Sequence, residues 1–299
     1  MANAPIRTDH LIPRGVPTAT EVLGQAGAEN FPVASRFLPA RVRSHLMAVY
    51  GFARLADDIG DEAEGDRLAM LDWLDGELIR AAGGAASHPL LVRLTATIHA
   101  CRLPLDPFQR LIEANRRDQV VHEYETFDAL LEYCELSANP VGDLVLRIFD
   151  VATPERLALS DSVCTGLQLV EHLQDVGEDA KAGRVYLPAE DLARFECTPD
   201  DLTAASASPR LRALVRFEAA RARRFLDAGG TLASLLSGRV RLAVAGFAAG
   251  GYAALDAIER ADGDVLAVRC RPNTGRVVAR LGTVLRASAT TRLHGGRGR

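Results

Sequence analysis

The chain has 299 residues, 48% of them hydrophobic and 25% charged, so it can bury a sizeable core under an ordinary charged surface. A net charge of −4 gives no reason to expect nucleic acid as a partner. Five scattered cysteines without a CxxC pair argue against a disulfide framework or a zinc site, and they favour a reducing compartment.

Hydrophobic residues recur with a helical period along nearly the whole chain, and the alternating pattern of strands is essentially missing. Thr126 and Thr153 are predicted N-caps, and Asn139 followed by Pro140 is predicted to start a helix with the asparagine as its cap. We expect an all-α protein, a single bundle of roughly ten helices around a central apolar cavity. The predicted helices span 41–59, 67–82, 90–101, 107–119, 127–136, 139–150, 154–176, 211–236, 240–259 and 276–287.

The domain is predicted to span residues 18–285, with an N-terminal extension over 1–17 and a disordered tail over 286–299. The apolar run 242–255 is too short to cross a bilayer, which needs about 20 residues, and it is typical of a close-packed core helix. Small residues cluster on one face of 138–145, 166–170 and 245–249. Such faces suit either room for a long isoprenoid chain or close helix packing.

Two acidic clusters each end a strongly apolar helical run. Residues four apart share a helix face, and like charges stacked there repel by a few tenths of a kcal/mol per pair. Each cluster alone also fits a solvated helix end. Together they favour a compensating cation, and their oxygen ligands suit Mg²⁺, which proteins commonly share with substrate phosphates. The predicted metal ligands are Asp57, Asp58 and Asp61 in the first cluster and Glu171, Asp175 and Asp179 in the second.

Basic residues near these clusters are candidates for binding a diphosphate. Arg54 lies one turn before the first cluster, and Arg116, Arg117, Lys181 and Arg184 are the other candidates. For Arg117 and Lys181 a solvated surface role fits equally well.

The pattern Tyr50-x-x-x-Arg54-x-x-Asp57-Asp58-x-x-Asp61, with QLxxxxxDVGEDxxxGRxYLP at 168–188, resembles the squalene and phytoene synthase family. The resemblance covers roughly residues 18–275 and implies the all-α class I isoprenoid synthase fold. The segments 29–39, 133–149 and 172–179 look most like the hydroxysqualene-forming branch of the bacterial hopanoid pathway. That branch implies Mg²⁺-dependent ionisation of presqualene diphosphate, rearrangement, and capture of the cation by water, with several Mg²⁺ ions and no NADPH.

The resemblance also implies roles for individual residues. The six acidic residues match the two metal-binding motifs. Residues implied to bind the substrate diphosphate are Arg54, Arg184, Lys181 and Asn30. Residues implied to lie near the reacting carbons as catalytic groups, besides Arg54, are Tyr50, Tyr133, Gln168, Tyr186 and Tyr252.

The chain departs from its condensing relatives at three places. Glu171 stands where they usually have Asn, and Gln174 where they usually have Arg, which removes a cation and leaves the role of Gln174 open. The stretch 28–31 replaces a Ser-x-Ser-Phe motif, which fits an enzyme that does not couple two farnesyl diphosphates. Two alternatives stay open: a condensing synthase that makes presqualene diphosphate, phytoene or squalene, and a catalytically inactive scaffold of the same family.

The group that positions the quenching water is also open at this point. Polar candidates are Tyr50, Tyr133, Asn139, Gln168 and His172, and a lone histidine on an apolar helix is more often a satisfied core residue than a catalytic one. Because the implied substrate is amphipathic, we expect a cytoplasmic protein that works at the inner face of the membrane beside neighbouring pathway enzymes.

Overall fold

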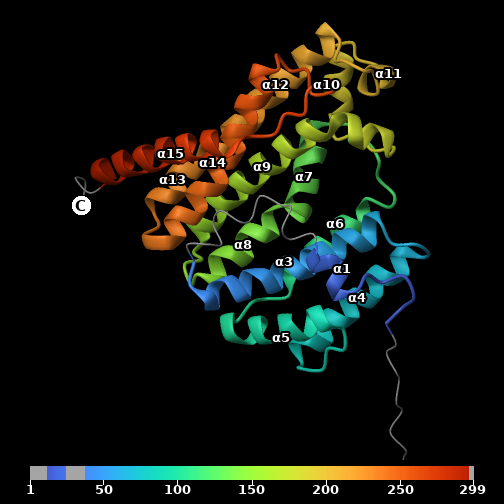
Figure 1. Cartoon of the computed structure of the whole chain (residues 1–299), viewed down its shortest axis with the longest axis vertical. Coiled ribbons are helices and arrows are strands. Elements are labelled where there is room, and N and C mark those ends of the chain that lie inside the picture. The colour runs from blue at the N-terminus through green and yellow to red at the C-terminus, as the bar shows by residue number, and fades with distance from the viewer. Residues whose placement is uncertain (1–11, 25–37, 296–299) are drawn as a thin grey trace, which may run out of the picture.

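Helices make up most of the described chain. The computed structural model describes residues 12–24 and 38–295, and the β pairing in this part is limited to one isolated bridge between Glu123 and Val185. The predicted all-α class is confirmed. In chain order (Figure 1) the helices are α1 (Ala19–Gly24), α3 (Ala40–Asp61), α4 (Arg67–Ala82), α5 (Pro89–Cys101), α6 (Asp106–Arg117), α7 (Phe127–Ser137), α8 (Asn139–Ile148), α9 (Pro154–Lys181), α10 (Ala189–Arg194), α11 (Pro199–Leu202), α12 (Pro209–Leu226), α13 (Ala228–Ser234), α14 (Gly238–Arg260) and α15 (Thr274–Gly295).

The helix starts follow the capping residues at two of the three predicted places. The Thr126 and Thr153 hydroxyls accept hydrogen bonds from the backbone N–H groups of Ala129 and Arg156, at 3.2 and 3.3 Å. The prediction for Asn139 is wrong, because Ala138 is the N-cap of α8. The Asn139 side-chain oxygen instead accepts a hydrogen bond from the Thr165 hydroxyl at 3.1 Å, which joins α8 to α9.

Two other expectations are corrected near the C-terminus. The predicted helix over 211–236 divides at Asp227 into α12 and α13. The following Gly229 packs closely on α14, since a Cβ there would lie 2.8 Å from that of Ala248. The last helix runs to Gly295, so residues 286–295 are helical where a disordered tail is predicted. This helix packs on α13 and α14 through a cluster that includes Val284. The short helices α10 and α11 were not predicted.

Helix α9 is the central element. It packs against α7, α8, α12, α13 and α14, and Figure 1 shows it running through the middle of the molecule. A Cβ at Gly142 would lie 2.3 Å from Ser160 Oγ, and one at Gly166 would lie 3.0 Å from the backbone nitrogen of Leu226. These two small residues therefore serve close helix packing. Around Gly246, by contrast, a Cβ would meet nothing within 4 Å.

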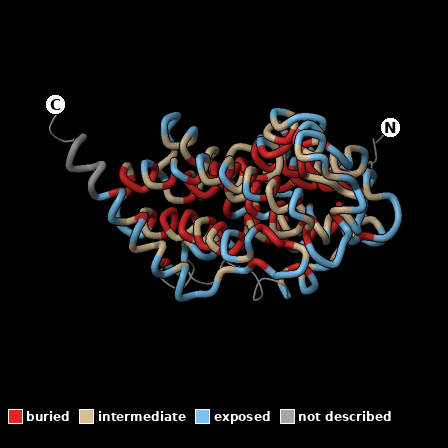
Figure 2. The backbone as a smooth tube through the Cα atoms, turned by 90° about the horizontal axis from the view of Figure 1, so that it is seen from above, coloured by how far each residue is buried: buried red, intermediate tan, exposed pale blue. Residues whose placement is uncertain are grey.

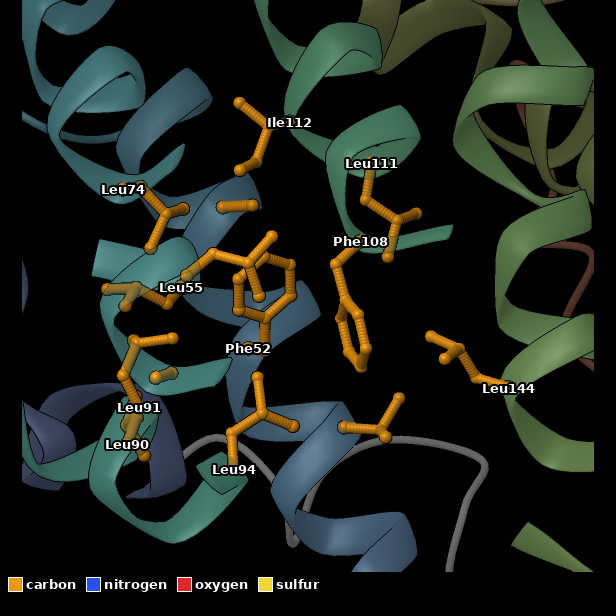
Figure 3. Packing of buried hydrophobic residues seen from close by; sticks show 14 of the residues in the cluster. Phe52, Leu55, Leu74, Leu90, Leu91, Leu94, Phe108, Leu111, Ile112 and Leu144 are labelled. Atoms are coloured by element: carbon orange, nitrogen blue, oxygen red, sulfur yellow. The ribbon is translucent and has the colours of Figure 1, made fainter. Parts of the chain in front are cut away.

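The N-terminal half has its own apolar core, built mainly by α3, α4, α5 and α6 (Figure 3). Phe52 and Phe108 are fully buried and meet edge to face with ring centroids 5.0 Å apart. Burial of such a side chain stabilises the fold by about 1.5–3 kcal/mol. Because Phe52 lies on α3 just before the first acidic cluster, this packing fixes the end of the helix that carries it.

Helix α14 is, within the described residues, the one helix long and apolar enough to cross a membrane by length and composition. In its most apolar window 61% of the residues are buried inside the protein. It packs against α9, α12, α13 and α15, and the buried residues run along the inside of the helical layers in Figure 2. Its packing is that of a core helix.

Candidate active site

A cavity of about 280 Å³ lies between α3, α6, α7, α9 and the loop that follows α9. It brings together two segments of the chain that lie more than 100 residues apart, since one wall comes from the end of α3 and the opposite wall from the second half of α9. Its lining residues are Arg54, Asp57, Asp61, Leu111, Ala114, Asn115, Asp118, Tyr133, Ser137, Gln168, Glu171, His172, Asp175, Asp179, Arg184 and Tyr186.

The end of α3 contributes two of its three predicted acidic residues to the cavity. Asp57 and Asp61 line it, as their spacing of four residues predicts. Asp58 does not line it: this side chain is buried and pairs with Arg54, whose Nε lies 2.7 Å from Asp58 Oδ1. Asp58 therefore orients Arg54, which itself lines the cavity.

Helix α6 supports Asp57 through a residue that the sequence did not suggest. Asn115 Nδ2 donates a hydrogen bond to Asp57 Oδ1 at 3.1 Å. This contact depends on Gly60, since a Cβ there would lie 2.2 Å from Asn115 Oδ1. Gln119 closes the junction by donating to the carbonyl oxygens of Gly60 and Asn115, both at 3.0 Å. The glycine within the first acidic cluster was the available signal for this close approach.

The second acidic row lies along one face of α9. Glu171, Asp175 and Asp179 all line the cavity, at the spacing of four that the sequence predicts. Burial, and next the charge of Asp175, raise the pKa of Asp179 to about 7. Burial raises the pKa of Asp175 as well. The positive charges near Asp175 and Asp179 are therefore too few to offset burial and the repulsion between the carboxylates.

This donor set fits divalent cations. A cation between the two rows would counteract the burial and the repulsion from Asp175 that raise the pKa of Asp179, and carboxylate oxygens are the ligands that Mg²⁺ prefers. Within the part of the chain that the structure describes, no group of three or more His, Cys, Asp or Glu side chains is arranged to hold a metal ion by itself. Mg²⁺ usually keeps several waters and binds through one or two carboxylates together with substrate phosphates, and the two carboxylate rows suit that mode of binding.

The loop after α9 brings one cation into the site. Gly183 adopts a φ of +80° and ends the helix, and Val185 N–H donates to the His122 carbonyl at 2.8 Å. This pairing with the α6–α7 loop directs Arg184 to the first acidic row, where its Nη1 lies 2.5 Å from Asp61 Oδ1. The Asp61 carboxylate, with others nearby, raises the pKa of Arg184 in spite of burial, so the guanidinium stays charged.

Asp118 is a second site residue that the sequence did not suggest. It follows α6, and burial raises its pKa to about 6, against the effect of a hydrogen bond from Tyr133. The Tyr133 hydroxyl donates to Asp118 Oδ2 at 2.6 Å, and the Tyr186 hydroxyl donates to Oδ1 at 3.3 Å. Asp118 thus fixes both predicted tyrosines in the cavity wall.

His172 completes this aromatic wall. Its ring stacks on that of Tyr186 with centroids 3.9 Å apart and planes 13° apart. Burial, and next the charge of Arg184, lower the pKa of His172 to about 3, so the imidazole is neutral near pH 7. Its Nε2 lies 3.4 Å from Nε2 of Gln168, one turn earlier on α9.

Several predicted site residues lie outside the cavity lining. Tyr50 is half-buried on α3, and Lys181 is exposed at the end of α9. The Tyr252 hydroxyl donates to Asp227 Oδ1 at 2.6 Å, away from this cavity. Asn30 lies outside the described residues.

The other basic candidates and Gln174 also have partners elsewhere. Arg116 pairs with Asp72 on α4 at 2.7 Å, and Arg117 approaches Glu132 at 3.8 Å. Gln174 donates a hydrogen bond to the Cys270 carbonyl, so it faces the loop between α14 and α15.

Comparison with known proteins assigns the chain to a family. The model of the squalene/phytoene synthase family matches residues 25–280. The chain belongs to the squalene/phytoene synthase family. Its members are enzymes of the isoprenoid synthase type that act on prenyl diphosphates and generally use divalent metals, and this chain is accordingly an enzyme of that class.

Relatives with two different activities are similar to this chain. A hydroxysqualene synthase from Zymomonas mobilis is 37% identical over 206 residues, which cover 66% of this chain and 67% of the relative. A phytoene synthase from Arthrospira platensis is 32% identical over 213 residues, covering 66% and 69%.

Solved structures share the fold. A squalene synthase from Alicyclobacillus acidocaldarius matches with a TM-score of 0.76 and 45% identity, over 80% of this chain and 91% of that one. A dehydrosqualene synthase matches with a TM-score of 0.79 and 25% identity, over 89% and 94%. The expected class I isoprenoid synthase fold is confirmed.

Proposed function

We propose that this protein is a hydroxysqualene synthase that ionises presqualene diphosphate and captures the rearranged cation with water. The observation that carries the proposal is the cavity in which Asp57 and Asp61 on α3 face Glu171, Asp175 and Asp179 on α9. The similarity to hydroxysqualene synthases at 36–37% identity supports the choice of substrate.

The overall reaction is balanced without a reductant. The bond between the cyclopropylcarbinyl carbon and its oxygen breaks, and the electron pair leaves with pyrophosphate. After rearrangement, the oxygen of a water molecule forms the new carbon–oxygen bond, and the proton that the water loses passes to pyrophosphate. The products are hydroxysqualene and protonated pyrophosphate, so NADPH has no role.

The residues divide this work by their position. Asp57, Asp61 and the α9 carboxylates would hold Mg²⁺, which when bound neutralises the negative charge of the leaving pyrophosphate. Arg184 and Arg54 line the same part of the cavity and supply fixed positive charge there. Tyr133 and Tyr186, oriented by Asp118, form an aromatic wall whose electron-rich faces stabilise a carbocation.

A condensing synthase is the second candidate. The similarity to a phytoene synthase and to a dehydrosqualene synthase structure favours it specifically. In that case farnesyl or geranylgeranyl diphosphate would be consumed directly. An inactive scaffold fits less well, because five of the six predicted metal ligands line one cavity.

One experiment separates these functions. Purified protein with Mg²⁺ and without NADPH is incubated with presqualene diphosphate and, separately, with farnesyl diphosphate. Hydroxysqualene from the first and no product from the second supports the proposal, and presqualene diphosphate formed from farnesyl diphosphate contradicts it. Asp57→Ala and Asp175→Ala should abolish turnover while circular dichroism shows an intact fold.

The cellular place follows from the substrate. Presqualene diphosphate carries a polar head on two long hydrocarbon chains, so the enzyme would collect it at a membrane surface, which we propose is the cytoplasmic face. Sedimentation of the protein with vesicles that contain presqualene diphosphate tests this association.

A further inference from the structure

Two polar side chains in the cavity wall, Gln168 and His172, have no role in the loss of pyrophosphate described above. Gln168 and His172 both line the cavity, one turn apart on α9, and they contact each other through their Nε2 atoms at 3.4 Å. The other polar groups considered for water capture either form a hydrogen bond with another side chain or do not line the cavity. The Tyr133 hydroxyl donates to Asp118, Asn139 is buried against Thr165, and Tyr50 does not line the cavity.

The contact between the two side chains fixes their roles. The Gln168 amide nitrogen is a donor, so the imidazole Nε2 that faces it is the acceptor. The amide oxygen of Gln168 then remains as an acceptor on a side chain that lines the cavity. His172 is in turn held by the stacking of its ring on Tyr186 and by burial, with 8% of its surface exposed.

We propose that Gln168 accepts a hydrogen bond from the quenching water and that His172 is a positioning residue that holds the Gln168 amide in the required orientation. A water whose hydrogen is bound to the amide oxygen turns an oxygen lone pair toward the cation. The new carbon–oxygen bond forms from that lone pair, and the proton passes to pyrophosphate as above. The inference rests on the proposed function and adds to it the residues that select the alcohol over other products.

The neighbouring side chains favour this part of the wall. Tyr133 and Tyr186 flank the pair, with Tyr133–Tyr186 and Tyr133–His172 ring centroids 5.5 and 6.1 Å apart. The α9 carboxylates that line the cavity begin at Glu171 and continue away from Gln168 along the helix. The pair therefore lies where the aromatic wall meets the acidic row, between the place for the hydrocarbon cation and the place for the pyrophosphate.

The test measures two products in one reaction: pyrophosphate released and hydroxysqualene formed from presqualene diphosphate with Mg²⁺. His172→Leu and Gln168→Leu should retain pyrophosphate release within a few-fold, while hydroxysqualene per pyrophosphate falls about tenfold and hydrocarbon products of proton loss appear. His172→Gln keeps an acceptor and Gln168→Glu keeps the amide's oxygen acceptor, so each should recover part of the alcohol yield.

Matched controls lie outside the cavity. His45→Leu and Gln109→Leu remove the same groups where they contact Thr97 and Asp75, and both should keep the wild-type product ratio. An unchanged ratio in the His172 and Gln168 leucine variants, or a parallel loss of both products in folded protein, would overturn the inference. If His172→Leu does not fold, the Gln168 variants decide. A wild-type enzyme that makes no hydroxysqualene contradicts the proposed function itself, which is a separate outcome.

Discussion

Arg184 Nη1 lies 2.5 Å from Asp61 Oδ1, and this ion pair joins the loop after α9 to the end of α3. Burial raises the pKa of Asp179 on α9 and the charge of Arg184 opposes that rise, so one guanidinium acts on both acidic rows. The guanidinium is only partly exposed, at 24%, so solvent screens it less than it screens a surface pair.

Arg184→Ala should therefore weaken diphosphate binding more than it weakens the fold. We expect the affinity for inorganic pyrophosphate with Mg²⁺, measured by calorimetry, to fall about tenfold or more, because a charge-assisted hydrogen bond is lost. Arg184→Lys should recover only part of it, since the ammonium lacks the planar fork. Arg210→Ala is the control, because Arg210 is 61% exposed and pairs with the exposed Glu196. Equal affinities for Arg184→Ala and wild type would contradict this role.

Asn115 should tune metal binding through Asp57. Asn115→Leu removes the donor that orients the Asp57 carboxylate. Loss of such a supporting hydrogen bond typically lowers metal affinity by about 10–100-fold. We expect the Mg²⁺ concentration for half-maximal stabilisation by pyrophosphate, followed by thermal unfolding, to rise accordingly. An unaltered Mg²⁺ dependence would show that Asp57 needs no such support.

Gly60→Ala should destabilise the junction of α3 and α6. The added Cβ would meet Asn115 Oδ1 at 2.2 Å, and overpacking of this kind costs about 1–3 kcal/mol. Gly76→Ala in α4 is the matched control, because its Cβ would find its nearest neighbour, Arg80 Nη1, at 3.5 Å. That control should be neutral or more stable by about 0.5–1 kcal/mol, since alanine is the better helix former. Denaturant unfolding measures both, and a neutral Gly60→Ala would contradict the described contact.

The sequence predicted the parts of the site that follow helical periodicity. Asp57 with Asp61, and Glu171 with Asp175 and Asp179, share faces because residues four apart must do so. The predicted capping threonines were right for the same local reason. The prediction that Asp58 also lines the cavity was wrong, because its side chain is directed toward Arg54 instead.

The features of the site and fold that could not be predicted from the sequence depend on tertiary contacts. Asp118 and Asn115 enter the site only because α6 crosses α3 and α7, and neither has a local pattern that marks it. The division at Asp227 and the partner of Asn139 likewise depend on contacts with other helices, α14 and α9. Tyr252 matched a family position, yet its hydroxyl contacts Asp227 outside the described cavity.

Stability at low pH should depend on Asp264, which does not line the cavity. This buried carboxylate accepts hydrogen bonds from Ala207 N–H, Ala267 N–H and Ser206 and pairs with Arg212. Together these contacts lower its pKa to about 2 in spite of burial, which opposes them. Because the folded-state pKa lies below the unfolded value of 3.8, the carboxylate stabilises the fold above about pH 4, and this is lost as pH falls toward 2.

Asp264→Asn should accordingly cost about 1–2 kcal/mol in the free energy of unfolding at pH 7, and the difference from wild type should shrink as the pH falls through that window. Asp262→Asn is the control, since Asp262 is 69% exposed in its pair with Arg216 and should change stability by less than about 1 kcal/mol. A cost that is independent of pH would rule out the carboxylate charge as its cause.

The measurement that tests the central claim most directly uses water labelled with oxygen-18. Purified protein, Mg²⁺ and presqualene diphosphate are incubated in the labelled water without NADPH, and the products are analysed by mass spectrometry. The account predicts hydroxysqualene that carries one oxygen-18 atom in its hydroxyl group, formed together with pyrophosphate. Recovery of unchanged presqualene diphosphate from correctly folded protein, or a hydrocarbon product without oxygen, would contradict it.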